Sequence, residues 1–314
     1  MPASPALRVP VLAAATLAAL ASLLGFVDGR LWLAEVASSL RLQLLVAAIA
    51  LVALAVLARS ATGGGLAAVV LLVNAAVLVP LYTGGPAAAA GVARLRVAHV
   101  NMQGHSGDLD AFGRIVASER PDVMVVLEPS NGWLAEVSRH VWGYRILAGG
   151  GRWRPRVMVL ATARLTDVRV PVTRGLPESA LAFDVALDGR PVRVLAVHTL
   201  SPSTPGDRRG RDEELEAVAA WARQHRGSEI VLGDLNATPW SSVLRRLEDA
   251  GSLRNSADGF GAQPTWPSFA GPLGIPIDQL LHSSDLTVTD RDTRRGFGSE
   301  HRSLWVTVAR AARE

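Results

Sequence analysis

The first 83 residues of the chain are almost free of charge, and this constrains the fold more than any other feature. Ala, Leu and Val dominate three apolar runs, at about residues 9–27, 42–58 and 65–83. A helix rises about 1.5 Å per residue, so runs of about 17 to 19 residues approach the hydrocarbon thickness of a bilayer, about 30 Å. We therefore predict three transmembrane helices in residues 1–83.

The first run has a second interpretation. Arg8 precedes it and small residues fill it, which is also typical of a signal peptide. A signal peptide followed by two helices, or three buried helices of a soluble protein, therefore stay open. Residues 84–92, GGPAAAAGV, are typical of a short flexible linker, and we expect a separately folding domain at residues 93–314.

The orientation in the membrane depends on few charges. Arg30 and Arg41, with the first arginines of the domain, lean towards a cytoplasmic domain by the positive-inside rule. Three helices, however, place the two termini on opposite sides. A short inside N-terminus with Arg8, followed by a second inside connection with Arg59, would leave the domain outside. We expect a multi-pass cell-membrane protein with an extracytoplasmic domain.

The remaining residues have the mixed composition of a globular domain. The chain has no cysteine, which excludes a disulfide framework and a thiolate metal site. Four of its 32 basic and two of its 28 acidic residues precede the linker, which leaves a net charge of +2 for the domain. A protein dedicated to duplex DNA usually has a stronger basic footprint. The sequence indicates no obligate protein partner.

Short apolar segments recur along the domain and predict buried strands, because Val, Ile and Leu dominate them. The segments are LRVAHV, DVMVVLE, VMVLAT, LAFDVAL, VRVLAVH, EIVLGD, IDQLLH and SLWVTVA. Asp188-Gly189 predicts a hairpin between two of them. Helices are expected at residues 108–119, 208–225 and 240–250. This alternation predicts an α/β fold, with two packed mixed β-sheets flanked by helices.

Polar residues occupy the ends of several predicted strands. They are Asn101, Glu128, His198, Asp234, Asn236, Asp278, Glu300 and His301. Each has an alternative explanation as a solvated strand end, a satisfied core histidine or a turn residue. Asp278 is harder to explain in this way, because it lies in an apolar run and a buried unpaired carboxylate costs several kcal/mol. If the strand ends converge, they supply hard oxygen ligands suited to Mg²⁺ or Mn²⁺, and hence to phosphoryl transfer to water.

Six motifs resemble those of the endonuclease/exonuclease/phosphatase superfamily, which has the DNase I-like fold. They are HVNMQG, VLEPS, AVHTLSP, LGDLNATP, PIDQLL and GSEHRS, in the order found in that superfamily. The segment PTWP at residues 264–267 is similar to bacterial members. The resemblance covers residues 94–310 and implies a four-layer α/β sandwich. It also implies hydrolysis of a phosphodiester or phosphomonoester that depends on Mg²⁺ or Mn²⁺.

The resemblance also implies a role for each polar position. Asp234 would orient or deprotonate the attacking water, and Asn236 would hold that water or a phosphate oxygen. His301 would stabilise negative charge on the phosphate, with Asp278 fixing its tautomer. His198 would contact the phosphate and the leaving group.

Metal ligation would fall to three residues, Asn101, Glu128 and Glu300, with Glu128 as the principal ligand. Two positions depart from the superfamily. Glu300 replaces the usual Asp before the last His, and its extra methylene displaces the carboxylate by about 1.5 Å. Gln103 replaces an Asp that the abasic-site endonucleases often have.

The substrate stays open between nucleic acid, phospholipid and inositol phosphate, because one cleft serves all three in the superfamily. Four tryptophans could form a substrate-facing rim or pack in the core: Trp133, Trp142, Trp153 and Trp266. Arg152, Arg154 and Arg156 could bind phosphates or be solvated. The alternative function is a non-catalytic membrane sensor that binds a phosphorylated ligand.

Overall fold

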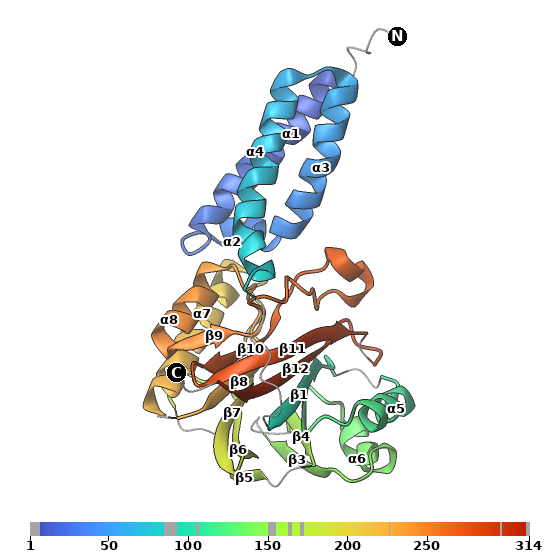
Figure 1. Ribbon diagram of the computed structural model, residues 1–314, viewed down its shortest axis with the longest axis vertical. Coiled ribbons are helices and arrows are strands. Elements are labelled where there is room, and N and C mark those ends of the chain that lie inside the picture. Colours follow the sequence, from blue (N-terminus) through green and yellow to red (C-terminus); the bar gives the residue numbers. More distant parts are fainter. Residues whose placement is uncertain are drawn as a thin grey trace.

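The computed structural model describes residues 7–84, 93–104, 107–149, 155–162, 165–169, 173–225, 227–295 and 297–311. Its first part is a helical bundle (Figure 1) formed by α1 (Arg8–Leu24), α2 (Trp32–Ser39), α3 (Arg41–Ala58) and α4 (Ala61–Leu78), with short 3₁₀ turns at Gly25–Val27 and Val79–Tyr82. Three helices are long and apolar enough to cross a membrane: Arg8–Val27, Arg41–Ala58 and Ala61–Tyr82. Each contains one predicted run. The short helix α2 was not predicted.

The bundle exposes large apolar side chains, among them Leu17, Val56 and Leu72. Its buried positions are mostly small, such as Ala15, Ala48 and Ala67, which lets the helices approach closely. Apolar residues on the outside and small residues inside are typical of helices surrounded by lipid.

Two six-stranded mixed sheets form the rest of the molecule. The first sheet has the order β11-β12-β1-β2-β4-β3, and the second has the order β5-β6-β7-β8-β10-β9. The strands are β1 (Arg94–Asn101), β2 (Val123–Leu127), β3 (Arg145–Gly149), β4 (Val157–Ala161), β5 (Leu165–Arg169), β6 (Leu181–Leu187), β7 (Arg190–His198), β8 (Glu229–Asp234), β9 (Leu253–Asn255), β10 (Asp278–Ser283), β11 (Leu286–Arg294) and β12 (Ser303–Arg310). Among the described strands, only β1–β2 and β7–β8 pair in parallel.

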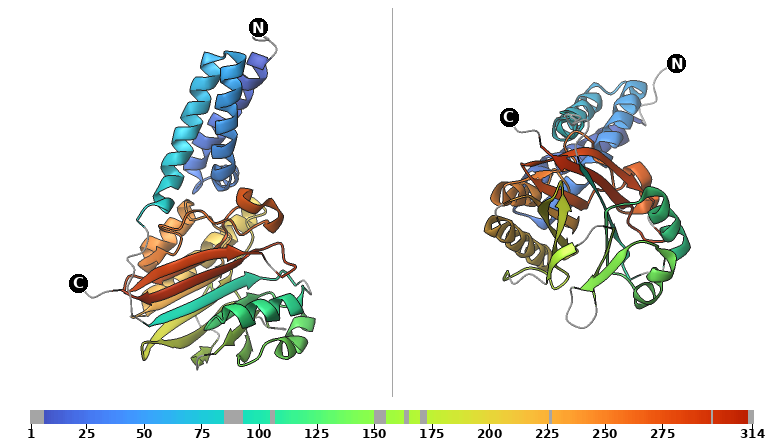
Figure 2. Two further views of the ribbon diagram at one scale, coloured as in Figure 1. Left: turned by 45° about the vertical axis from the view of Figure 1, so that its right-hand side comes forward. Right: turned by 60° about the horizontal axis from the view of Figure 1, so that its bottom comes forward.

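Helices cover the outer face of each sheet, which confirms the predicted arrangement of layers (Figures 1 and 2). Helices α5 (Leu109–Glu119) and α6 (Asn131–His140) pack on the first sheet through Phe112, Val116 and Trp133. Helices α7 (Pro205–Gln224) and α8 (Ser242–Gly251) pack on the second sheet through residues such as Leu215 and Leu244. A third core lies between the sheets. Central strands are thus buried on both faces, which is why they were continuous apolar runs in the sequence.

Local sequence signals place the helix starts. The side chains of Asp108, Ser130, Thr204 and Ser241 each cap a helix by accepting a hydrogen bond from a backbone N–H three residues on. The predicted helix at 108–119 is confirmed. Helix α7 starts before the predicted position, because Thr204 caps it and Pro205 suits its first turn. Helix α6 was not predicted.

The bundle rests on the second sheet and its helices through an extensive contact. Leu78 and Leu81 pack with Trp240, Ala257 and Ala262. The indole N–H of Trp240 donates to the Ser38 carbonyl at 2.7 Å, and that of Trp32 to the Pro202 carbonyl at 2.7 Å. Most of the predicted linker lies outside the described residues. Separate folding of residues 93–314 stays a prediction, and the isolated domain would lose these contacts.

Candidate active site

Six of the predicted polar positions lie at one end of the two sheets. Asn101 ends β1, Glu128 follows β2 and His198 ends β7. Asp234 ends β8, and it pairs in register with His198 on one side and with Asp278, the first residue of β10, on the other. Parallel neighbouring strands have their carboxyl ends on the same side of a sheet. The antiparallel strand β10 brings its amino end to that side. His301 lies just before β12.

Asp234 is buried and held from two sides. The Asn101 side-chain amide donates to its Oδ2 at 3.0 Å, and the Asn236 backbone N–H donates to its Oδ1 at 3.1 Å. The preceding Gly233 has φ of +149°, and a Cβ there would lie 1.8 Å from the Val197 carbonyl oxygen. Only glycine permits β8 to deliver Asp234 so close to β7, which explains the glycine of the LGDLNATP motif.

Asn236 forms the turn that follows. Its φ is +47°, in the left-handed region, and its side-chain amide donates to the Thr199 carbonyl at 3.0 Å. Its own carbonyl accepts a hydrogen bond of 2.5 Å from the buried Arg211 guanidinium. The strained turn is therefore fixed from both sides, as expected where a site requires one backbone geometry.

Asp278 is fully buried between two histidines. Its Oδ2 contacts His301 Nδ1 and its Oδ1 contacts His99 Nε2, both at 2.8 Å. The Thr265 hydroxyl accepts hydrogen bonds from the Ile277 and Asp278 backbone N–H groups. His99 was not predicted as a site residue, although it opens the motif HVNMQG. Thr265 belongs to the PTWP segment, whose part in the site is to position Asp278.

These contacts determine the charges of the cluster. Burial opposes ionisation of Asp278, but His301 and His99 hold its pKa far below the usual range. Burial lowers the pKa of His301, but Asp278 and the charge of Asp234 outweigh it and raise that pKa to about 9. Burial and the neighbouring Asp278 raise the pKa of Asp234. His301 is therefore an imidazolium at neutral pH, and its Nε2 lies 3.7 Å from Asp234 Oδ2.

His198 joins Glu128 to this cluster. Its Nδ1 lies 2.9 Å from Glu128 Oε1 and its Nε2 lies 3.6 Å from Asp234 Oδ2. Burial lowers the pKa of His198, but the hydrogen bond to Glu128 and the nearby carboxylates outweigh it and raise that pKa. Glu128 itself has φ of +47°. Glu128 is thus a second residue with a strained backbone at this end of the sheets.

Asp234, Asp278 and His301 can each offer a ligand atom within 4.8 Å of the others. The surrounding donors are the Glu128 carboxylate and the Asn101 amide, so oxygen predominates, which fits a hard divalent cation. Both Asp278 oxygens already contact histidines, and the Asn101 Oδ1 accepts from the Gln103 backbone N–H. Two histidines thus offset the charge of Asp278, whereas the direct donors to Asp234 are neutral amide groups, so Glu128 and Asp234 are the acids better suited to a divalent cation.

Glu300 lies apart from these residues. It is exposed, and no group of three potential ligands in the described part of the chain includes it. Its contact with the fold is through its backbone carbonyl, which accepts from the Ser268 N–H at 2.6 Å. The adjacent Ser299 faces inward instead, and its hydroxyl donates to the Asn101 carbonyl. The geometry thus gives no support to Glu300 as a metal ligand.

The tryptophans and arginines considered as a substrate-facing rim lie in different parts of the domain. Trp133 is buried in the core below α5 and α6, so the packing interpretation holds for it. Trp142 is 85% exposed between α6 and β3, at the strand ends opposite the site. Trp266 pairs with Ile275 in an isolated bridge close to Asp278. Arg156 precedes β4, while Arg152, Trp153 and Arg154 lie outside the described residues.

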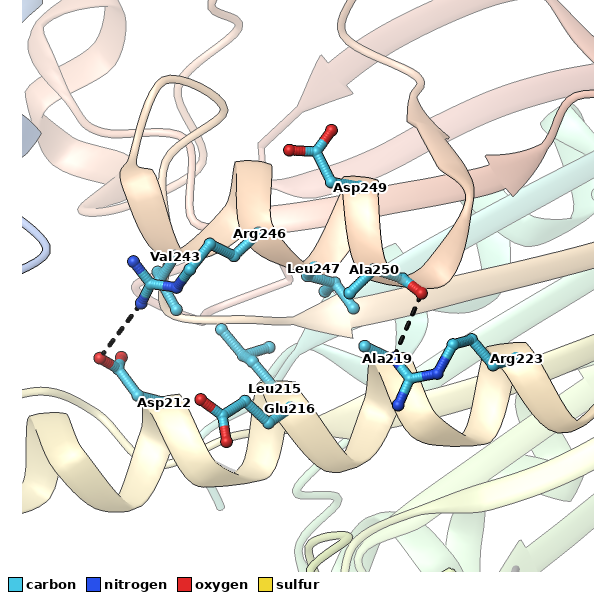
Figure 3. A pocket seen from close by; sticks show the side chains of 10 residues that line it. All are labelled: Asp212, Leu215, Glu216, Ala219, Arg223, Val243, Arg246, Leu247, Asp249 and Ala250. Atoms are coloured by element: carbon cyan, nitrogen blue, oxygen red, sulfur yellow. Dashed lines mark hydrogen bonds and ion pairs between the residues drawn. The ribbon is translucent and has the colours of Figure 1, made fainter.

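A cavity of about 600 Å³ lies away from this cluster, between α7 and α8 (Figure 3). Asp212 and Arg246 form one wall and contact each other at 3.6 Å. Asp212 also contacts Arg211 at 2.8 Å, and Arg211 in turn contacts Glu35 of α2. The cavity therefore borders an ion-pair network that connects the helical bundle with the carbonyl of Asn236.

Comparisons with solved structures show the fold. D. rerio TDP2 complexed with a single-strand DNA product has a TM-score of 0.58 and 14% identity, over 68% of this chain and 98% of that chain. Truncated Caenorhabditis elegans TDP2 has a TM-score of 0.56 and 19% identity, over 69% and 98%. An endonuclease/exonuclease/phosphatase from Beutenbergia cavernae has a TM-score of 0.53 and 17% identity, over 70% and 72%.

Sequence comparison identifies the family directly. No curated protein matches the chain significantly. The sequence model of the Endonuclease/Exonuclease/phosphatase family, in contrast, matches residues 98–301, which include every strand-end residue described above. The match extends over more than half of the chain, and the two sheets with their flanking helices have the fold of that family. The chain belongs to the Endonuclease/Exonuclease/phosphatase family.

Proposed function

We propose that this protein is a membrane-anchored, divalent-metal-dependent phosphoester hydrolase. One observation carries the proposal: two imidazoles, His198 and His301, face the same buried carboxylate oxygen of Asp234 at 3.6 and 3.7 Å. These distances exceed a direct hydrogen bond, so the three groups surround a common point. A carboxylate and two proton-bearing imidazoles are the groups that hydrolysis of a phosphoester by water requires.

Each residue of the site has a role in the proposed reaction. Asp234 orients the attacking water and accepts its proton, while Asn101 and the Asn236 N–H hold the carboxylate in place. The His301 imidazolium, kept charged by Asp278, stabilises negative charge on the phosphate. His198 donates a proton towards the leaving group, and its proton is retained through Glu128. Asn236 maintains the turn and offers its amide to the phosphate.

Mg²⁺ or Mn²⁺, held by Glu128 with Asp234 and Asn101 nearby, would polarise the phosphate oxygens. The gathering of acids supports this assignment, because the buried Asp234 and Asp278 and the partly buried Glu128 lie where ionised carboxylates repel one another. A cation lowers that repulsion and favours the ionised form of Asp234.

We also propose a membrane topology, which the arrangement of the bundle supports. The Arg8 side chain donates to the Ala58 carbonyl, so the arginines at 8 and 59 lie at the end of the bundle far from the sheets. We place that end in the cytoplasm and the catalytic residues outside. Alkaline phosphatase fused after Glu314 should then be active, and a cytoplasmic reporter fused there should be silent. The reverse pattern would place the catalytic residues in the cytoplasm.

Activity is tested on the full-length protein in detergent. Release of product from bis-p-nitrophenyl phosphate, an oligonucleotide, an inositol phosphate and a phospholipid is measured with Mg²⁺, Mn²⁺ or EDTA. We expect hydrolysis of at least one substrate with metal and none with EDTA. Ligand binding without turnover under all conditions would favour the non-catalytic sensor, and full activity in EDTA would reject the metal.

A further inference from the structure

The segment between Thr265 and Asp278 carries an exposed aromatic tip. It contains a short 3₁₀ stretch, Ser268–Leu273, in which the Phe269 side chain is 86% exposed and that of Leu273 is 47% exposed. We call residues 268–274 the lip. Covering these two side chains with another apolar surface would be favourable, because it removes apolar area from water.

The lip is attached to the candidate active site. The Ser268 N–H donates to the Glu300 carbonyl at 2.6 Å, and its hydroxyl donates to the Ser299 carbonyl at 3.1 Å. These two residues immediately precede His301. At the base of the lip, Trp266 and Ile275 exchange backbone hydrogen bonds. The tip therefore has a fixed position next to the residues that would bind the phosphate.

The lip is also attached to the helical bundle. The Gln43 side-chain amide donates to the Leu273 carbonyl at 2.7 Å and to the Gly274 carbonyl at 3.3 Å. Gln43 lies in the first turn of α3, which is one of the three candidate spans. Figures 1 and 2 show the lip, in dark orange, on the side of the sheets that faces the helices. The lip is therefore level with the start of α3, one of the candidate spans.

A cavity of about 370 Å³ lies beneath the tip and contains cationic groups. Phe269 and Gly271 of the lip line the cavity together with Ser299, Arg295 and Arg302. The Arg302 Nη2 donates to the Thr293 carbonyl, which fixes that guanidinium at the cavity. An exposed aromatic side chain beside two arginines matches a ligand with an anionic head and an apolar body.

We propose that the lip inserts into the bilayer surface and that the substrate is a phospholipid, taken from the same membrane in which the helices lie. This inference rests on the proposed function, because it names the substrate class of that site. Phe269 and Leu273 enter the boundary between headgroups and acyl chains, and Arg295 and Arg302 bind the lipid phosphate as it moves towards His301. A single-stranded nucleic acid, stacked on Phe269, is the competing ligand.

Insertion is measured without reference to activity. The chain has no cysteine, so Phe269→Cys gives a single site for an environment-sensitive fluorophore in the full-length protein. The protein is reconstituted into vesicles of phosphatidylcholine and phosphatidylglycerol. Trp142→Cys is the matched control, since Trp142 is 85% exposed and lies between α6 and β3, which Figure 1 shows away from the helical bundle.

We expect the label at 269 to emit at shorter wavelength and to be quenched by nitroxide-bearing lipids, and the label at 142 to be quenched by aqueous iodide instead. Equal quenching of both labels by iodide would overturn the insertion, whatever the activity of the protein. This outcome is distinguishable from a failure of the proposed function, in which all substrates stay intact but the label at 269 is still buried in lipid.

The substrate class is measured by a ratio. In the Phe269→Ser variant, hydrolysis of vesicle phospholipid should fall about tenfold relative to that of bis-p-nitrophenyl phosphate, because the variant can no longer bury an aromatic side chain in the bilayer. Trp142→Ser should leave the ratio unchanged. If the Phe269→Ser variant instead hydrolyses the oligonucleotide more slowly and phospholipid at the wild-type rate, Phe269 stacks on bases and the lipid proposal is rejected.

Discussion

Two buried clusters of charge lie on either side of Asn236, and they differ in chemistry. The cluster at the candidate active site combines carboxylates with histidines: Asp234, Asp278, His99, His198 and His301. The anchor cluster combines carboxylates with arginines: Glu35, Arg208, Arg211 and Asp212. Histidine exchanges its proton near neutral pH, whereas arginine retains its proton at all physiological pH values. The first cluster can therefore transfer protons, and the second can only hold structure.

The clusters meet at one backbone carbonyl. Arg211 contacts Glu35 of the bundle and donates to the carbonyl of Asn236, whose N–H holds Asp234. The helical bundle thus contributes to the geometry of the candidate active site through two intervening residues. Three predictions test this difference between the candidate active site and the anchor cluster, and a fourth concerns a buried acid outside both.

The largest effect is expected at Asp234. Asp234→Asn keeps the size of the side chain but removes the proton acceptor, so the hydrolysis rate should fall about 10²-fold or more. The rate is measured with bis-p-nitrophenyl phosphate under saturating Mg²⁺. Asp184→Asn is the control, because Asp184 is a buried acid that pairs with Arg193 away from the site. Wild-type turnover in Asp234→Asn would reduce Asp234 to a turn-forming residue.

Glu128→Gln should act on the metal. The amide is a weaker ligand than the carboxylate, so the Mg²⁺ concentration for half-maximal activity should rise about tenfold or more. Activity is titrated with Mg²⁺ in the wild type and the variant. Glu300→Gln is the matched comparison. Because Glu300 is exposed, this variant should have the same Mg²⁺ titration as the wild type. A larger shift for Glu300→Gln than for Glu128→Gln would reverse the assignment of the ligands.

A smaller effect is expected at Glu35, in the anchor cluster. Glu35→Gln weakens the grip on Arg211, but Asp212 still contacts that guanidinium at 2.8 Å. We expect a loss of about 1 kcal/mol in transition-state stabilisation, or about fivefold in kcat, with little change in KM. Glu213→Gln on the exposed side of α7 is the control. An unchanged kcat for Glu35→Gln would show that the bundle does not support the site.

The central strands and most site residues could be predicted from the sequence, while the sheet edges could not. All eight predicted strands lie inside the sheets, and the four that were missed are the four edges: β3, β5, β9 and β11. An edge strand pairs on one side only and keeps polar residues, as the largely exposed β5 does. Its sequence therefore lacks the continuous apolar run that identified the central strands.

The unpredicted site residues depend on contacts between distant segments. His99 was ambiguous within an apolar strand, and its role follows from Asp278, 179 positions away. Glu35 resembled a loop charge between two spans, and its partner Arg211 is 176 positions away. Neither pairing leaves a local signal, because the spacing along the chain has no relation to adjacency across the fold. The hairpin at Asp188-Gly189 shows the opposite case, since β6 and β7 pair directly across it, as predicted.

The smallest effect concerns a buried acid that belongs to neither cluster. Glu229, at the start of β8, is 4% exposed, and its Oε1 has no hydrogen-bond partner among the described residues. Burial raises the pKa of Glu229 from 4.5 to about 8, although Arg193 partly opposes it. The folded state therefore retains a proton that the unfolded state releases above its own, lower pKa. The stability contributed by this proton is present below about pH 4.5 and is lost as the pH rises towards about 8.

A glutamine at position 229 does not ionise. The Glu229→Gln variant should therefore lack this part of the pH dependence of the stability. The unfolding midpoint of the full-length protein in detergent is measured for both proteins between about pH 5 and about pH 9. We expect similar midpoints at the acidic end and a variant that is more stable by a few degrees at the alkaline end. The other titrating groups are common to both proteins, so they cancel in the difference. A difference that stays constant across the range would mean that Glu229 is ionised in the folded state, with Arg193 as an effective partner after all.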